Sequence, residues 1–61
     1  MSLSAVIIDD EEDAQKALSS LLKTNHSDLR LLGSADGVSS GLDLISRVAP
    51  DIMFLDVELG T

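Results

Sequence analysis

The chain has 61 residues, a net charge of −7 and no cysteine, so disulfides and thiolate metal sites are excluded. A domain of about 60 residues buries only roughly 60% of the surface that its unfolded chain exposes. The chain can therefore form at most one compact domain, and small folds of this kind usually need a metal or a partner. The four basic residues are scattered, which argues against direct nucleic-acid contact by this segment, because phosphate neutralisation needs clustered Lys and Arg.

Neither the start of the chain nor its apolar runs point to export or to a membrane. Residues 1–5 contain no basic region and no long apolar run, so no signal peptide is predicted. The longest apolar stretch, residues 52–55, is far too short to span a bilayer. We therefore expect a soluble cytoplasmic protein without membrane contact.

Three apolar runs predict strands. Residues 5–8 form the first run and residues 52–55 the last, and each is stopped abruptly by an acid. Continuous apolar runs without alternation are typical of strands that are buried on both faces, as in parallel sheets. Residues 29–34 form a less apolar run, which predicts an edge strand.

Two helical patterns lie between these runs. In both, apolar residues follow the i, i+3, i+4, i+7 spacing of one helix face. The first stripe consists of Ala14, Ala17, Leu18, Leu21 and Leu22, and the second of Val38, Gly41, Leu42, Ile45, Val48 and Ala49. Asn25 is predicted to end the first helix, Asp36 to be the N-cap of the second and Pro50 to close it.

The resulting order, β-α-β-α-β, predicts an α/β fold with a parallel sheet and right-handed crossovers. With the flavodoxin-like strand order 2-1-3, the first and third strands are neighbours, and their carboxyl ends lie about 4.8 Å apart. Ligands of open α/β sheets bind outside the carboxyl ends of the strands. A functional site is therefore expected at the carboxyl ends of the first and third strands, where residues 9 and 56 meet.

Aspartates end both of these strands. Asp9, with Asp10 beside it, follows the first run and Asp56 follows the last, so three carboxylates are expected in one crevice. Like charges so close repel unless a cation offsets them, and Mg²⁺ is the first choice among hard, oxygen-binding ions. A single Asp after a strand is more often a helix N-cap, but the coincidence on two adjacent strands favours a functional site.

These motifs resemble a known family, the receiver domains of response regulators in two-component signalling. Residues 6–11, Val-Ile-Ile-Asp-Asp-Glu, resemble the opening strand and acidic pair of a receiver, and residues 50–56 resemble the strand that presents its phosphorylated aspartate. Residues 35–37 and 41–42 also match the family's pattern. The resemblance covers essentially all of residues 1–61 and implies a partial, N-terminal half receiver with its first three strands and two helices.

The resemblance implies a role for each acid. Asp56 would take a phosphoryl group from a phosphohistidine on a sensor histidine kinase and would also be a ligand of Mg²⁺. Asp10 would bind Mg²⁺ directly, Asp9 mainly through water, and the backbone carbonyl of Glu58 would be a further ligand. Such a domain accepts phosphate without turnover, so no enzyme is expected. The opening of residues 7–12 also resembles regulators that carry a LytTR-type DNA-binding domain downstream, which implies transcriptional output through a further domain.

The sequence departs from the family in two respects. Receivers usually have a proline soon after the acceptor, whereas residues 57–61 here read Val-Glu-Leu-Gly-Thr. The later strands that end in Thr or Ser and in Lys are absent. Thr61 lies in the loop after the last strand, and Lys16 and Lys23 fall within the first helix, so none of them is assigned those roles.

Two alternatives remain open. Asp56, Glu58, Gly60 and Thr61 echo a haloacid-dehalogenase-like phosphatase, although the spacing differs by one residue and the acid pair would be unexplained. The chain could instead be a truncated, non-catalytic half-domain that acts only through oligomerisation. Its last strand would then have an open hydrogen-bonding edge and uncovered apolar surface, which we expect a homo-oligomer partner or further chain to cover.

Overall fold

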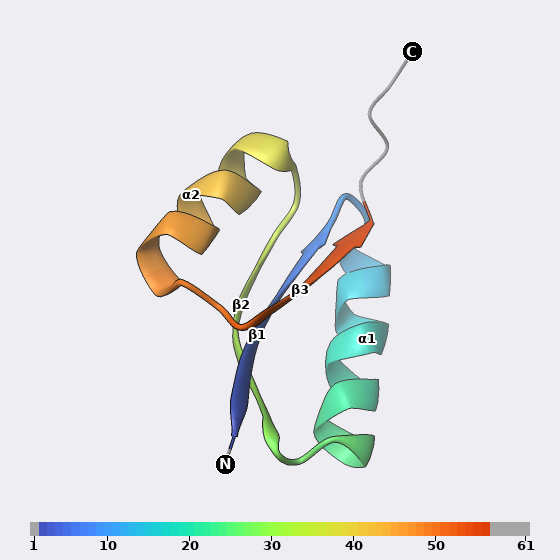
Figure 1. Ribbon diagram of the computed structural model, residues 1–61. Coiled ribbons are helices and arrows are strands. Elements are labelled where there is room, and N and C mark those ends of the chain that lie inside the picture. The colour runs from blue at the N-terminus through green and yellow to red at the C-terminus, as the bar shows by residue number, and fades with distance from the viewer. Residues whose placement is uncertain (1, 57–61) are drawn as a thin grey trace.

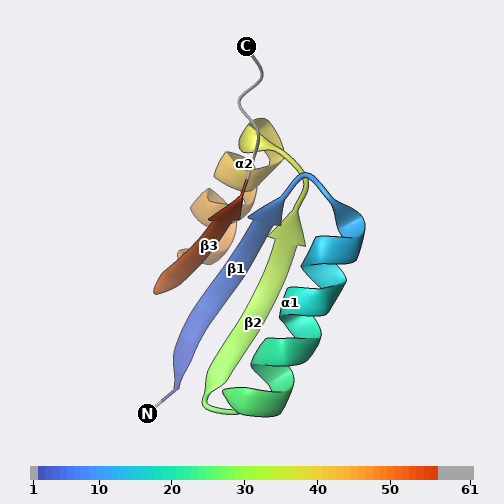
Figure 2. The same ribbon diagram turned by 90° about the vertical axis from the view of Figure 1, so that its right-hand side faces the viewer.

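A computed structural model describes residues 2–56, which alternate between strands and helices as predicted (Figure 1). The elements are β1 (Leu3–Asp9), α1 (Glu12–Asn25), β2 (Leu29–Ala35), α2 (Val38–Val48) and β3 (Ile52–Asp56). The three strands form one parallel sheet in the order β2-β1-β3, and α1 and α2 lie on opposite faces of it (Figure 2). The predicted flavodoxin-like half-domain, with strand order 2-1-3, is confirmed. Within residues 2–56, neither helix is long and apolar enough to cross a membrane.

The centre of the core is β1. Residues 4–9 of this strand are all buried, and Val6 and Ile7 are the largest side chains that are completely enclosed. Both helices pack against β1, and it is hydrogen-bonded to a strand on each side, with Ile7 opposite Ser34 in β2 and Phe54 in β3. A strand enclosed on both faces needs apolar residues at every position, which explains its unbroken apolar run.

An unbroken apolar run was also predicted to make β3 a strand that is buried on both faces. This prediction is wrong for β3 within the described part of the chain. Neither helix packs against β3, and its outward side chains remain open, with Met53 46% and Leu55 61% exposed. Residues 52–55 are therefore as apolar as a fully enclosed strand, but residues 2–56 do not enclose them.

The predicted helix stripes are only partly correct. Leu22 is the buried residue of α1, whereas Leu21 is 55% exposed, and in α2 the buried residues are Gly41 and Leu44. Leu44 lay outside the predicted stripe and Leu42, which was in it, is 64% exposed. The cause is the close approach of Gly41 to β1, where a β-carbon on Gly41 would lie 2.8 Å from Cδ1 of Ile8. This contact sets the rotation of α2 and places Leu44 over the sheet.

The helix ends follow the predictions with one exception. The first helix ends at Asn25, and Ala49 caps the second in a left-handed conformation (φ 45°) immediately before Pro50. Asp36 is not the N-cap of α2, because the helix begins after Gly37, which provides no side-chain cap. The Asp36 carboxylate instead accepts a hydrogen bond from Oγ of Ser40 (3.1 Å).

A hydrogen-bonded pair, Ser4 and Asp51, fastens the start of β3 to the start of β1. Oδ2 of Asp51 accepts from the backbone N–H of Ser4 (2.9 Å) and from its hydroxyl (3.0 Å), while the Asp51 N–H donates to the Ser4 carbonyl (3.0 Å). The backbone N–H of Ser4, and next its hydroxyl, favour the charged carboxylate and lower the pKa of Asp51. These residues are 47 positions apart, so no local sequence pattern could reveal the pair.

The Ser4–Asp51 pair predicts a specific pH dependence of stability. Because the pKa of Asp51 is lowered on folding, its contribution is fully present above the ordinary value of 3.8 and is lost as the pH falls through the lowered pKa. The difference in free energy of unfolding between the natural protein and Asp51→Asn should therefore be larger at about pH 6 than at about pH 2. Urea unfolding at both pH values measures it, with Asp28→Asn as the control, and a difference that does not change with pH would contradict the prediction.

Candidate functional site

The carboxyl ends of β1 and β3 meet as predicted. The two strands are parallel neighbours whose register pairs Asp9 with Asp56, the last residue of each strand. Paired residues on neighbouring strands are held about 4.8 Å apart in the hydrogen-bonding direction. The ends of β1 and β3 lie side by side (Figure 1), so the sheet brings two aspartates that are far apart in sequence to the same edge.

Asp9 is buried, at 6% exposure, and one of its two carboxylate oxygens has a structural role. Oδ1 accepts a hydrogen bond from the backbone N–H of Glu11 (2.9 Å), which closes the turn between β1 and α1. Among the hydrogen bonds within residues 2–56, none reaches Oδ2. One oxygen of Asp9 therefore shapes the turn, and no described residue bonds to the other.

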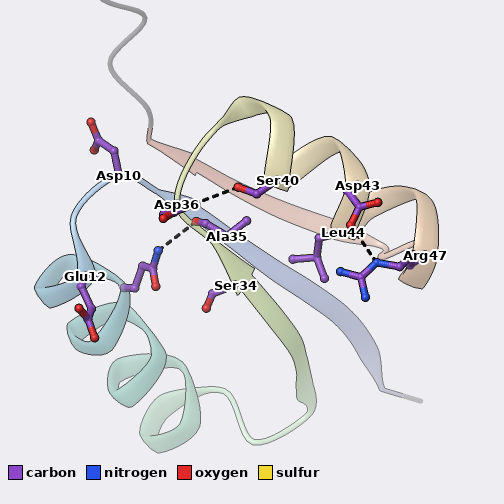
Figure 3. A pocket seen from close by; sticks show the side chains of 10 residues that line it. Asp10, Glu12, Ser34, Ala35, Asp36, Ser40, Asp43, Leu44 and Arg47 are labelled. Atoms are coloured by element: carbon purple, nitrogen blue, oxygen red, sulfur yellow. Dashed lines mark hydrogen bonds and ion pairs between the residues drawn. The ribbon is translucent and has the colours of Figure 1, made fainter.

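Asp10 and Asp56 are exposed. Asp10 lies on the turn that follows β1, and its side chain points outward from that turn (Figure 3). Asp56, the last residue of β3, is also exposed. Among the described residues, no group of three or more His, Cys, Asp or Glu side chains is arranged to hold a metal ion. The fourth predicted ligand, Glu58, lies outside the described residues.

The residues at the strand ends nevertheless fit Mg²⁺ in their chemistry. They offer carboxylate oxygens, which hard divalent cations prefer, and no nitrogen or sulfur ligand. Mg²⁺ keeps several waters and is commonly bound through only one or two protein carboxylates, so a three-carboxylate cage is not required. Oδ2 of Asp9 and the exposed carboxylates of Asp10 and Asp56 are oxygens of this kind. The ligand assignment itself stays a prediction.

A cleft of about 550 Å³ opens on the β2 side of these strand ends (Figure 3). Most of its polar side chains already have partners, since Ser40 donates to Asp36 and Nε of Arg47 donates to Oδ2 of Asp43 (3.1 Å). The cleft includes Asp10 but not Asp56. It is therefore a neighbour of the predicted crevice between β1 and β3, and not the same space.

Gln15 is a residue of this region that the sequence analysis did not single out. Its Nε2 donates to the backbone carbonyls of Asp9 (2.7 Å) and Ala35 (3.0 Å), which end β1 and β2. The only signal in the sequence is a neutral polar residue beside the apolar stripe of the first helix, six positions after Asp9. That signal does not identify its partners, because Ala35 is 20 residues away.

Comparison with known proteins places this geometry in a signalling context. The chain is 37% identical over 57 residues to an uncharacterized response regulatory protein of Vibrio cholerae and 35% identical over 57 residues to the sensory transduction protein LytT of Bacillus cereus. It is also 36% identical over 56 residues to a protein-glutamate methylesterase/protein-glutamine glutaminase of Methanosarcina barkeri. No family model matches the chain, and no solved structure matches it.

The predicted resemblance to the N-terminal half of a response-regulator receiver domain is confirmed by these matches together with the fold. They cover 93% of the chain for the Vibrio and Bacillus proteins and 92% for the Methanosarcina protein. The chain spans only 24%, 23% and 15% of the lengths of those three relatives. The similarity therefore describes a receiver segment, in proteins much longer than this chain.

Proposed function

We propose that this chain accepts a phosphoryl group on Asp56 from a sensor histidine kinase, in a reaction that depends on Mg²⁺. The observation that carries the proposal is the pairing of Asp9 with Asp56 at the carboxyl ends of adjacent strands, in a chain similar to response regulators. Asp9 is buried and its register partner Asp56 is exposed, which supports a carboxylate held in place beside one that a phosphodonor can approach.

The chemistry needs few groups. A carboxylate oxygen of Asp56 attacks the phosphorus of a phosphohistidine, the P–N bond breaks, and an acyl phosphate forms while the imidazole leaves with the bonding electrons. A carboxylate nucleophile has no proton to lose, so no general base is needed. Asp9, Asp10 and Asp56, with the backbone carbonyl of Glu58, would hold Mg²⁺. When bound, the ion offsets the repulsion between the attacking carboxylate and the phosphoryl oxygens.

The proposed role is that of a phosphorylated switch and not of a turnover enzyme. The methylesterase activity in the name of the Methanosarcina relative belongs to that protein, of which this chain spans 15%. The similarity to the sensory transduction protein LytT supports a signalling role. Transcriptional regulation through a further output domain is proposed from the resemblance of residues 7–12 to regulators of the LytTR type. Direct nucleic-acid contact by this segment is not part of the proposal.

Phosphorylation by a small phosphodonor tests the proposal. The protein is incubated with acetyl phosphate in the presence of Mg²⁺ or of a chelator, and its intact mass is measured. We expect about one phosphoryl group for each chain with Mg²⁺ and background labelling with the chelator. Equal labelling in both samples would contradict the metal dependence. Steady hydrolysis of p-nitrophenyl phosphate, without a stable phosphoprotein, would favour the phosphatase alternative.

A second role, self-association, is favoured by the state of β3. This strand is at the edge of the sheet formed by residues 2–56, and its exposed Met53 and Leu55 add apolar surface to that edge. Homo-oligomerisation through β3 would cover both the open edge of this strand and its exposed apolar side chains. Sedimentation velocity of the protein at several concentrations tests it, and a single monomeric species throughout would contradict it.

A further inference from the structure

Gln15 joins three elements at the carboxyl edge of the sheet. It lies in the first turns of α1, and its side-chain amide reaches the last carbonyls of both β1 and β2. Both partners are carbonyl oxygens, so only the NH₂ end of the amide can face them, and each of its two protons has one acceptor. The Ala35 bond is drawn as a dashed line in Figure 3. Ala35 is the register partner of Ile8, so Gln15 adds one more link where the β1–β2 ladder ends.

The Asp9 carbonyl matters because it belongs to the peptide that joins Asp9 to Asp10. Fixing the direction of this carbonyl fixes the peptide plane from which both side chains depart. The N–H of Glu11 holds the same acid pair from the other side, through Oδ1 of Asp9 (2.9 Å). The start of α1 therefore restrains the two acids at two points, Oδ1 of Asp9 and the Asp9 carbonyl. The restraint on the carbonyl comes from the side chain of Gln15.

We propose that Gln15 is a positioning residue that sets the Mg²⁺ affinity of the acid pair Asp9–Asp10. The inference rests on the proposed function, because it takes these acids as metal ligands. Gln15 acts only through the backbone and touches neither the metal nor the phosphoryl group. Outer hydrogen-bond partners of metal ligands typically change metal affinity by about 10–100-fold when they are removed.

Direct Mg²⁺ titration of the unphosphorylated protein by calorimetry tests the proposal. Gln15→Met keeps the length of the side chain and its lack of charge but removes both donors, and we expect its Kd for Mg²⁺ to rise about 10-fold. Leu22→Ala is the control for general destabilisation. Leu22 is buried on the same helix, about 10 Å further along its axis, and its truncation should lower stability without changing the Kd for Mg²⁺.

The outcomes separate this inference from the function on which it rests. A Kd for Gln15→Met within twofold of the natural protein, or an equal weakening in Leu22→Ala, would overturn the role of Gln15 and leave phosphorylation untouched. If the natural protein binds Mg²⁺ with the expected dependence on Gln15 but takes no phosphate, the proposed function fails and the role of Gln15 stands. A natural protein that binds no Mg²⁺ overturns both.

Discussion

Asp56→Asn is expected to reduce phosphate incorporation from about one group for each chain to background. The amide is neutral and a far weaker nucleophile than the carboxylate, and it has no anionic oxygen with which to form an acyl phosphate. Asparagine has nearly the same size, and the Asp56 side chain is exposed, so the fold should be unaffected. Intact mass after incubation with acetyl phosphate and Mg²⁺ measures the result, and hydroxylamine, which cleaves acyl phosphates, shows that the label is of that kind.

The matched control is Asp36→Asn. Asp36 directly follows β2, is exposed and lies at the same edge of the sheet, but it is on the opposite side of β1 from Asp56. This variant should take phosphate as the natural protein does. Full labelling of Asp56→Asn would show that another residue is the acceptor and would remove the central assignment of the site.

The meeting of Asp9 and Asp56 could be predicted because long-range topology decides it. Two apolar runs, each stopped by an acid, identify the strand ends, and the strand order 2-1-3 makes β1 and β3 neighbours. What each carboxylate does after that is decided by the conformation of one turn. The bond from Glu11 to Asp9 and the outward direction of Asp10 depend on backbone angles that no hydrophobic pattern encodes.

The faces of the helices were harder to predict than their existence. Counting apolar residues at helical spacing places Leu42 and Leu21 in the core, yet both are largely exposed. The count treats every apolar residue alike, whereas the rotation of α2 is decided by where its backbone can come closest to the sheet. That position is Gly41, which packs directly on Ile8. The Ser4–Asp51 pair was missed for a related reason, since it exists only once the chain has folded.

Gly41→Val is expected to lower the free energy of unfolding by about 2–3 kcal/mol. A β-carbon at this position would lie 2.8 Å from Cδ1, 3.1 Å from Cγ2 and 3.2 Å from Cγ1 of Ile8, and Ile8 is itself buried in the central strand. Neither the new side chain nor Ile8 can move freely, so α2 must shift away from the sheet. Valine also has a better helix propensity than glycine, by a few tenths of a kcal/mol, which is too little to offset the overpacking. Urea unfolding followed by circular dichroism measures the change.

The double variant with Ile8→Val decides whether the Ile8 contact is the cause. Valine lacks Cδ1, the atom nearest to the new side chain, so the combined loss should be smaller than the sum of the two single losses by about 1 kcal/mol. Gly37→Ser is the glycine control, because a β-carbon there would meet only Oγ of Ser40 at 3.9 Å, and its stability should stay within about 0.5 kcal/mol of the natural protein. Strict additivity of Gly41→Val and Ile8→Val would show that the loss arises elsewhere in α2. The close approach of Gly41 to β1 would then not be what sets the rotation of this helix.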